Sequence, residues 1–272
     1  MSRPGWLSLR TRLYFLILFA VLPALLLTVY AGWRSRQIAR EEAEKGIARL
    51  AQMAAMTQDE LNSDTHTVLA LLAQHPALQG QDMTACTIAL REWHQRLPRY
   101  ANLALVTPTG DLLCSAVPPE GPVNYADRTW FAEAVRRRDF VIGGYVWGRV
   151  TGRPLATYAY PLLDEHGQVW RVLAAGLDLN WFESLMSQMH LPAGAVLTIV
   201  DGTGTVLTRV PDGSAWIGRD IRAAPLFQQL EAQTGERAFE AKDVDGVRRF
   251  WAVVPLHDAS TIGTSYVLVG MA

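Results

Sequence analysis

The 272-residue sequence contains only two cysteines, Cys86 and Cys114, which are too few for a scaffold held together by disulfides. Its six histidines are scattered without His-x-x-x-His or Cys-His spacing, so no metal centre is indicated. No Gly-x-Ser-x-Gly motif occurs, and Gly202-Thr203-Gly204 lies between two predicted strands, which is typical of a hairpin turn and not of a dinucleotide site. These absences argue against catalytic residues and against a bound cofactor.

Acidic residues are absent from the first 40 positions, which contain six arginines. Residues 41–272 therefore hold the other 19 of the 25 basic side chains and all 26 acidic ones, a net charge of −7. A nucleic-acid-binding domain needs a basic surface, so nucleic acid is not an expected partner. Half of the residues are apolar and 19% are charged, which excludes a disordered chain and allows one or two domains with cores.

Charged residues are also missing from Leu13–Trp33, a run of 21 mostly apolar residues. As a helix rising about 1.5 Å per residue, this run would span about 30 Å, the thickness of one hydrocarbon core. A cleaved signal peptide is the alternative, since arginines precede the run and residues 29–31 imitate a small-residue cleavage site. The length favours a retained anchor. Three arginines lie on each side, so the charges do not set its orientation.

Proline is missing from residues 35–75, and Gly46 is the only glycine there. Apolar residues recur at the steps of three, four or seven that one helix face requires: Ile47, Leu50, Ala51, Ala54, Leu61, Val68, Leu69 and Leu72. Pro76 ends this helix because a residue before proline is driven out of the helical region. A helix of about 40 residues is long for a globular element, so it is either a spacer or a rod that carries motion to the membrane.

The rest of the chain predicts the same series of elements twice. Between residues 84 and 179 the pattern predicts a helix, a β-hairpin, a short helix that Asp127 could cap, three strands and their turns. Pro192-Ala193-Gly194 forms a boundary, after which a hairpin, a helix and three strands are predicted again. Two such units predict an α+β repeat built on two antiparallel sheets.

Aromatic residues and arginines are interleaved between Asn124 and Asp178. A concave site for a small ligand needs this mixture, with aromatic walls for contact area and a few charged donors for orientation. The structural alternative is an arginine at a strand edge and aromatic residues that fill a core. The residues that we expect to bind a ligand are Tyr125, Arg128, Trp130, Phe131, Tyr145, Trp147, Tyr158 and Gly176.

The spacing Tyr125-x-x-Arg128-x-Trp130-Phe131, followed by a glycine-rich hairpin and a strand pair, resembles the membrane-distal half of double Cache (PDC-type) extracytoplasmic sensor domains. The resemblance runs from about Ser35 to the C-terminus. It implies an α+β fold with an N-terminal transmembrane helix, a long stalk helix and two PAS-like antiparallel-sheet modules. The expected parts are a cytoplasmic N-terminus and membrane helix (1–33), the stalk helix (34–80), a membrane-distal module (81–191) and a membrane-proximal module (192–272).

The resemblance also implies a function, the sensing of a small molecule by a membrane-anchored signal-transduction receptor. The sensor would lie on the periplasmic side of a bacterial inner membrane and would form a homodimer through the long helix. Cache receptors usually continue into an output domain such as a histidine kinase, a diguanylate cyclase or a chemoreceptor signalling region, so we expect either a sensory part of a longer chain or a stand-alone anchored domain. The alternative is a ligand-free membrane-anchored scaffold or dimerisation module, with the aromatic residues in its core.

In Cache receptors that sense amino acids, an arginine and a tryptophan hold the ligand carboxylate, and a tyrosine and two aspartates hold its ammonium group. The arginine, tryptophan and tyrosine positions are matched here, whereas the aspartate positions fall on Trp147 and Gly176. Asp178 lies two residues further on, on the same strand face by alternation. A buried ammonium without a counter-charge is costly, so we expect an amine-free carboxylate or a small aromatic compound.

Two expectations concern residues outside this set. Cys86 and Cys114 are either a disulfide, which the oxidising compartment implied by the resemblance favours, or two buried free thiols. Changes at Asp201 or Asp212, in the second module, are expected to leave ligand affinity nearly unchanged.

Overall fold

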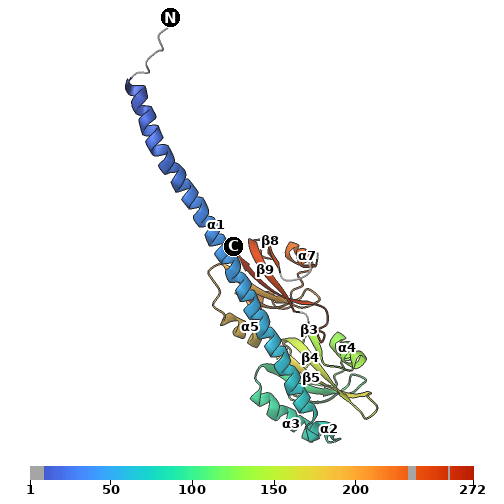
Figure 1. Ribbon diagram of the computed structural model, residues 1–272. Helices are drawn as coiled ribbons and strands as arrows, with labels where there is room; N and C mark the ends of the chain where they lie inside the picture. The colour runs from blue at the N-terminus through green and yellow to red at the C-terminus, as the bar shows by residue number, and fades with distance from the viewer. Residues whose placement is uncertain (1–8, 232–236, 257) are drawn as a thin grey trace. The chain divides into compact units, whose positions relative to one another are not determined.

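A computed structural model describes residues 9–231, 237–256 and 258–272 (Figure 1). The chain divides into two compact units, Met1–Gly46 and Ile47–Ala272, and helix α1 (Leu9–Ala73) contributes to both. The predicted membrane span, residues 13–33, falls in this helix, and most of its side chains lie outside the described residues. Across the part of the chain that is described, no helix is long and apolar enough to cross a membrane.

The second unit contains two antiparallel five-stranded sheets with the strand orders β2-β1-β5-β4-β3 and β7-β6-β10-β9-β8. The first consists of β1 (Tyr100–Val106), β2 (Leu112–Ser115), β3 (Val141–Trp147), β4 (Pro154–Leu163) and β5 (Val169–Asp178). The second consists of β6 (Ala195–Val200), β7 (Val206–Val210), β8 (Arg237–Lys242), β9 (Arg248–Leu256) and β10 (Ser265–Met271). The two orders are identical position by position, which confirms the predicted α+β repeat. We call the two halves the first and second module.

In the described ranges, six further helices connect or cover the strands: α2 (Pro76–Gln79), α3 (Met83–Arg96), α4 (Thr129–Arg137), α5 (Leu179–Ser187), α6 (Gly213–Trp216) and α7 (Pro225–Glu231). Helix α3 is capped by Asp82, whose carboxylate accepts from the backbone N–H of Thr84 at 2.9 Å. The predicted cap of α4 is wrong, because Arg128 is its N-cap residue and makes no side-chain cap bond. The Asp127 carboxylate is instead held by Arg149.

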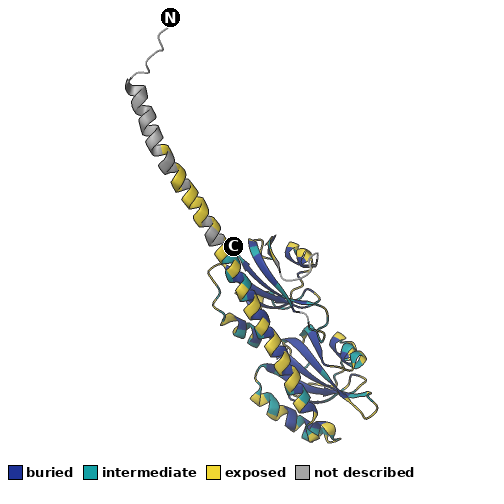
Figure 2. Ribbon diagram, viewed as in Figure 1, coloured by how far each residue is buried: buried dark blue, intermediate teal, exposed yellow. Residues whose placement is uncertain are grey.

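Residues 47–73 of α1 belong to the core of the second unit, as the buried face of the helix in Figure 2 shows. Their buried apolar residues share one cluster with strands of both sheets, for example Leu103 on β1 and Val267 on β10. The helix also carries buried polar groups, since the Tyr100 hydroxyl donates to Thr65 Oγ1 at 2.8 Å. The apolar periodicity read from the sequence therefore marks a core helix here, not an isolated stalk.

A disulfide joins Cys86 in α3 to Cys114 in β2, with 6.1 Å between the two Cα atoms. Both residues are buried, so the bond lies inside the core of the first module. It connects α3 to the β1–β2 hairpin, and it is the disulfide that the sequence left as one of two alternatives.

The two modules are bonded to each other through β3. The backbone N–H of Ile142 donates to Ser260 O at 2.8 Å, and that of Tyr145 donates to Asp201 Oδ2 at 2.8 Å. Asp201 is buried, and its Oδ1 accepts from the backbone N–H groups of Thr203 at 2.9 Å and Thr205 at 3.0 Å. One carboxylate thus holds both its own β6–β7 turn and a strand of the first module.

We expect Asp201→Ala to lower the free energy of unfolding by about 2–3 kcal/mol, because three partly buried N–H groups lose their acceptor. Urea denaturation of the full chain measures this change. The matched control is Asp212→Asn, since Asp212 is exposed and makes no side-chain cap bond. A loss within about 0.5 kcal/mol of the control value would show that Asp201 does not link the modules.

Candidate functional site

A pocket of about 50 Å³ lies on the face of the first sheet that is turned away from α1. Its floor is formed by Asn102 and Ala104 of β1, Thr157 of β4 and Gly176 of β5. These residues are neighbours across the sheet, since Gly176 is paired with Asn102 on one side and Thr157 on the other. Because side chains alternate along a strand, paired residues point to the same face, and here that face is the pocket.

The walls of the pocket are aromatic. Tyr125 and Trp130 come from the loop before α4 and from its first turn, and their rings lie 5.5 Å apart, tilted by 52°. Trp147 ends β3 on the other side and is 57% exposed, and the turn 148–151 continues from it. Rings on two sides offer a planar or apolar ligand a large contact area at a small entropic cost.

Arg128 is one of the two cationic residues in the described lining of the pocket. It stands at the N-cap of α4, half-buried, and its Nη2 donates to the carbonyl of Trp147 at 3.2 Å. A guanidinium has five N–H donors in a rigid fork, so others remain for a carboxylate. The bond to Trp147 also ties the two walls of the pocket together.

Arg149 forms a second bridge across the pocket. Its guanidinium donates to Asp127 at 2.8 and 2.6 Å and to the carbonyl of Asn124, and it lies 5.9 Å from the Tyr125 ring centroid. The hydrogen bond from Arg149 holds the pKa of Asp127 below its usual value, and burial raises the pKa of Tyr125. At neutral pH, Asp127 offsets the charge of Arg149, and Tyr125 keeps its hydroxyl proton.

The described residues that line the pocket include no acidic side chain. Asp178 does not reach it, because its carboxylate caps α5 through the N–H of Asn180 at 2.9 Å and binds Arg153 at 3.2 Å. No group of three or more His, Cys, Asp or Glu side chains in the described residues is arranged to hold a metal ion. The pocket is therefore positive in character and suits an anion or a neutral ring.

Five of the eight residues that the sequence predicts as ligand-binding line this pocket. They are Tyr125, Arg128, Trp130, Trp147 and Gly176. Three of them lie within six residues of the chain, so a single loop and helix start brings them together.

Tyr158 and Phe131 lie outside the pocket. Tyr158 follows Thr157 on β4 and so points to the opposite face, where its hydroxyl donates to Asn62 Oδ1 of α1 at 2.9 Å. Burial raises the pKa of this hydroxyl. Phe131 follows Trp130 on α4 and is buried edge-on against it in the core under the helix.

Tyr145 also lies outside the pocket, because β3 contains an irregularity at Gly143-Gly144 that shifts its register. Its side chain packs on the second module, where a Cβ added to Gly218 would lie 2.6 Å from the Tyr145 hydroxyl. Its backbone N–H is the one that Asp201 accepts. Tyr145 therefore belongs to the contact between the modules. The expectation that a change at Asp201 leaves ligand affinity nearly unchanged stays a prediction, and Asp201 is bonded to a strand that carries a pocket residue.

Sequence reasoning missed Asn102, Thr157 and Arg149 as pocket residues. Asn102 is a polar residue in an otherwise apolar strand, and Thr157 interrupts the apolar start of β4. A polar residue inside an apolar strand is therefore the sequence pattern that could have identified both positions. Arg149 carried no signal, because its bond to Asp127 joins loops 22 residues apart.

A five-stranded antiparallel sheet that is repeated once along a shared long helix, with a pocket on the first sheet, defines a two-module PAS-like architecture. The sequence profile of the Cache domain family matches residues 35–272. The chain belongs to the Cache domain family.

Sporulation kinase D of Bacillus subtilis (strain 168) is a curated protein that this chain resembles, with 24% identity over 181 residues. The match covers 65% of this chain and 35% of the kinase, so the chain spans about a third of that relative.

Among solved structures, the extracellular domain assigned to the histidine kinase rpHK1S-Z16 has a TM-score of 0.76 at 19% identity, covering 86% of this chain and 96% of that one. The ligand-binding domain of the Pseudomonas aeruginosa PAO1 chemoreceptor PctB, in complex with L-Arg, has a TM-score of 0.69 at 17% identity, covering 85% and 95%. That of the Pseudomonas fluorescens chemoreceptor CtaA, with L-isoleucine, reaches 0.66 at 16% identity, covering 87% and 95%. These likenesses show a shared fold.

Proposed function

We propose that residues 35–272 are the extracytoplasmic sensor domain of a membrane-anchored receptor, and that the pocket of the first module binds a small carboxylate or aromatic compound. The observation that carries the proposal is Arg128 placed between the aromatic walls formed by Tyr125, Trp130 and Trp147. The ligand-bound chemoreceptor domains with the same fold support it, as does the similarity to sporulation kinase D.

The chemistry of the pocket favours an amine-free ligand. An α-amino acid brings an ammonium group that needs a counter-charge when it is desolvated. The described lining has two arginines, one of them offset by Asp127, and no carboxylate. A carboxylate on Arg128, with an apolar or planar body between the rings, leaves no charge unpaired. A substituent hydroxyl could meet the polar floor at Thr157.

The same structure suggests how occupancy would reach the membrane. Trp147 and the Gly143-Gly144 irregularity belong to β3, the strand bonded to Asp201 and Ser260 of the second module. Helix α1 packs against both modules and continues into the run that we propose as the anchor. A ligand that binds one arrangement of β3 better than another would shift the population of that arrangement. In this proposal α1 is also the dimer contact, and an output domain reads its state.

A thermal-shift screen of the full chain in detergent tests the proposal. At a concentration 100 times its Kd, a ligand should raise the Tm by about 5–10 °C, because it binds only the folded state. The neutral amide of each carboxylate hit is the matched control and should have a much smaller effect. If no small carboxylate or aromatic compound raises the Tm of the folded protein, the ligand-free scaffold becomes the better interpretation.

We expect Gly121→Cys to react with a membrane-impermeant maleimide on intact cells whose outer membrane has been permeabilised. Gly121 is exposed, and a side chain added there meets no atom within 4 Å. The native cysteines are joined and buried, so they should not react. Ser2→Cys, on the predicted cytoplasmic side, is the control that should react only after lysis. Labelling of Gly121→Cys only after lysis would place the sensor inside the cell.

A further inference from the structure

The second module repeats the backbone frame of the first-module pocket. The N–H of Tyr125 donates to the carbonyl of the turn glycine before β2 at 2.7 Å, and the N–H of Ile221 donates to the turn glycine before β7 at 2.9 Å. The next bond corresponds too, from Arg128 N to Tyr125 O and from Ala224 N to Ile221 O, both at 2.9 Å. Ile221 and Ala224 therefore stand where the first module has its tyrosine and its ligand-binding arginine.

The floor of this second frame is filled. In the first sheet Thr157 is paired with Gly176, and in the second sheet the same two places hold Trp251 and Gly270. Trp251 is completely buried, and a Cβ added to Gly270 would lie 2.7 Å from its ring. The indole thus lies over Gly270. In the first module Leu155 lies over the equivalent Gly176, 2.8 Å from where a Cβ would stand, and the smaller Thr157 lines the pocket beside it.

Three charged residues, together with Trp251, occupy the part of the second module that corresponds to the first-module pocket. Their positions follow from the matched strand pairs and from the hairpin bonds of Gly148 N to Arg153 O and of Asp243 N to Val247 O, both at 2.9 Å. Arg209, Asp243 and Arg249 stand where the first module has Ser115, Gly148 and Leu155.

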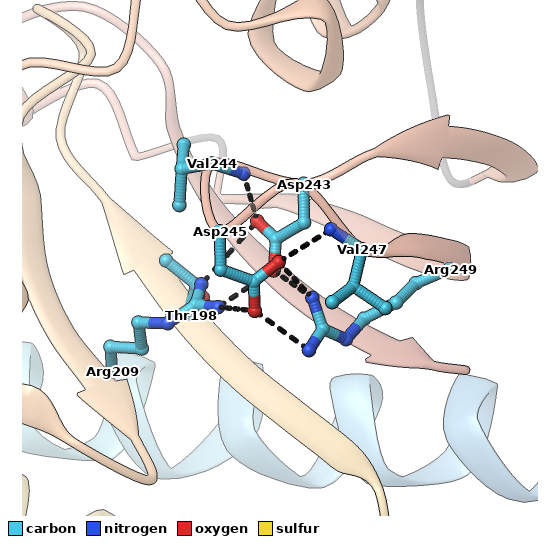
Figure 3. Close-up of polar contacts among 7 residues, drawn as sticks. All are labelled: Thr198, Arg209, Asp243, Val244, Asp245, Val247 and Arg249. Carbon is cyan, nitrogen blue, oxygen red and sulfur yellow. Dashed lines mark hydrogen bonds and ion pairs between the residues drawn. The ribbon is translucent and has the colours of Figure 1, made fainter.

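The side chains of these residues converge on one carboxylate (Figure 3). Asp243 is fully buried, and its Oδ2 accepts from Arg209 Nη2 at 2.6 Å and from Arg249 Nη1. Its Oδ1 accepts from the backbone N–H of Val244 at 2.7 Å. Asp245, which is partly exposed, binds Arg249 at 2.8 Å and balances the second positive charge. Two guanidiniums around one buried carboxylate are the arrangement by which proteins recognise carboxylate ligands.

We propose that Asp243 is a built-in occupant of a carboxylate site in the second module. It lies in the place where the first module has its pocket, and with Ile221, Ala224 and Val244 it also lines an open depression of the second module. Removing the Asp243 side chain should uncover a site for a small carboxylate between Arg209 and Arg249. This inference rests on the repeat and on the ion cluster, and it holds whatever the first module binds.

Asp243→Gly introduces the residue that the first module has at this place, and it should leave the two buried arginines with Asp245 as their one remaining carboxylate among the described residues. Acetate and formate are the probes, each exchanged for chloride at constant ionic strength with the full chain in detergent. We expect 100 mM acetate to raise the Tm of Asp243→Gly by about 3–8 °C, because a carboxylate with a millimolar Kd binds only the folded form. The wild-type protein should shift by less than a third of this.

Two control variants separate a site from a general salt effect. Asp243→Asn keeps the space filled and should show no acetate-specific rise. Asp243→Gly combined with Arg249→Leu, which copies Leu155 of the first module, removes one guanidinium and should also lose the response. If Asp243→Gly is unfolded in chloride, refolding from urea in acetate should recover folded protein and refolding in chloride should not. Equal behaviour in the two salts, or an equal rise in the wild type, would overturn the proposal.

Discussion

Arg128→Ala should weaken the affinity for a ligand found by screening about 30-fold to over 1,000-fold, because truncating one partner of a buried charge pair costs about 2–5 kcal/mol. The structure adds a reason for this expectation. The guanidinium is held at the pocket by the carbonyl of Trp147, and Ala224 stands at the same place in the second module. Isothermal titration calorimetry on the full chain measures the change.

The controls for Arg128→Ala follow from the geometry. Arg128→Lys keeps the charge but loses the two-pronged fork, so its affinity should lie between those of the wild type and Arg128→Ala. Asp212→Asn, an exposed change in the second module, should leave affinity within a factor of two. Among the described residues, the half-buried Arg128 side chain makes one hydrogen bond, to Trp147 O, so Arg128→Ala should still fold. Unaltered affinity in the folded variant would remove this pocket as the site.

Replacing both Cys86 and Cys114 by alanine should lower the free energy of unfolding by about 3–4 kcal/mol. The bond closes a loop with a sequence separation of 28 residues, and the chain-entropy model assigns this amount to a loop of that size. Urea denaturation without reductant measures the loss. Dithiothreitol should bring the wild type close to the double variant and should leave the double variant unchanged.

Mass spectrometry of a non-reduced digest provides an independent check on the disulfide. It should show one linked peptide pair that contains Cys86 and Cys114, and the pair should disappear on reduction. Two thiols that alkylate freely in the folded, unreduced protein would contradict the bond.

The sequence by itself determined the features that depend on short stretches of chain. The apolar periodicity from Ile47 to Leu72 predicted the buried face of α1. The repeated order of hairpin, helix and strands predicted two antiparallel sheets, which have the same topology. Tyr125, Arg128 and Trp130 were found because one turn and one helix start bring them together. In each case the pattern that predicts the element lies within a short stretch of chain, where spacing is a sufficient guide.

Only the tertiary structure decided which residues meet across the sheets. Thr157 and Tyr158 are adjacent in sequence, but the alternation of β4 sends one to the pocket and the other to α1. The irregularity in β3 turned Tyr145 toward the second module, and no pattern in its neighbours could have shown where Asp201 would lie. The filling of the second pocket by Asp243 depends on residues from three strands and a turn. Their convergence is a property of the packed sheet, because strand register and burial, not local propensity, set which side chains share a space.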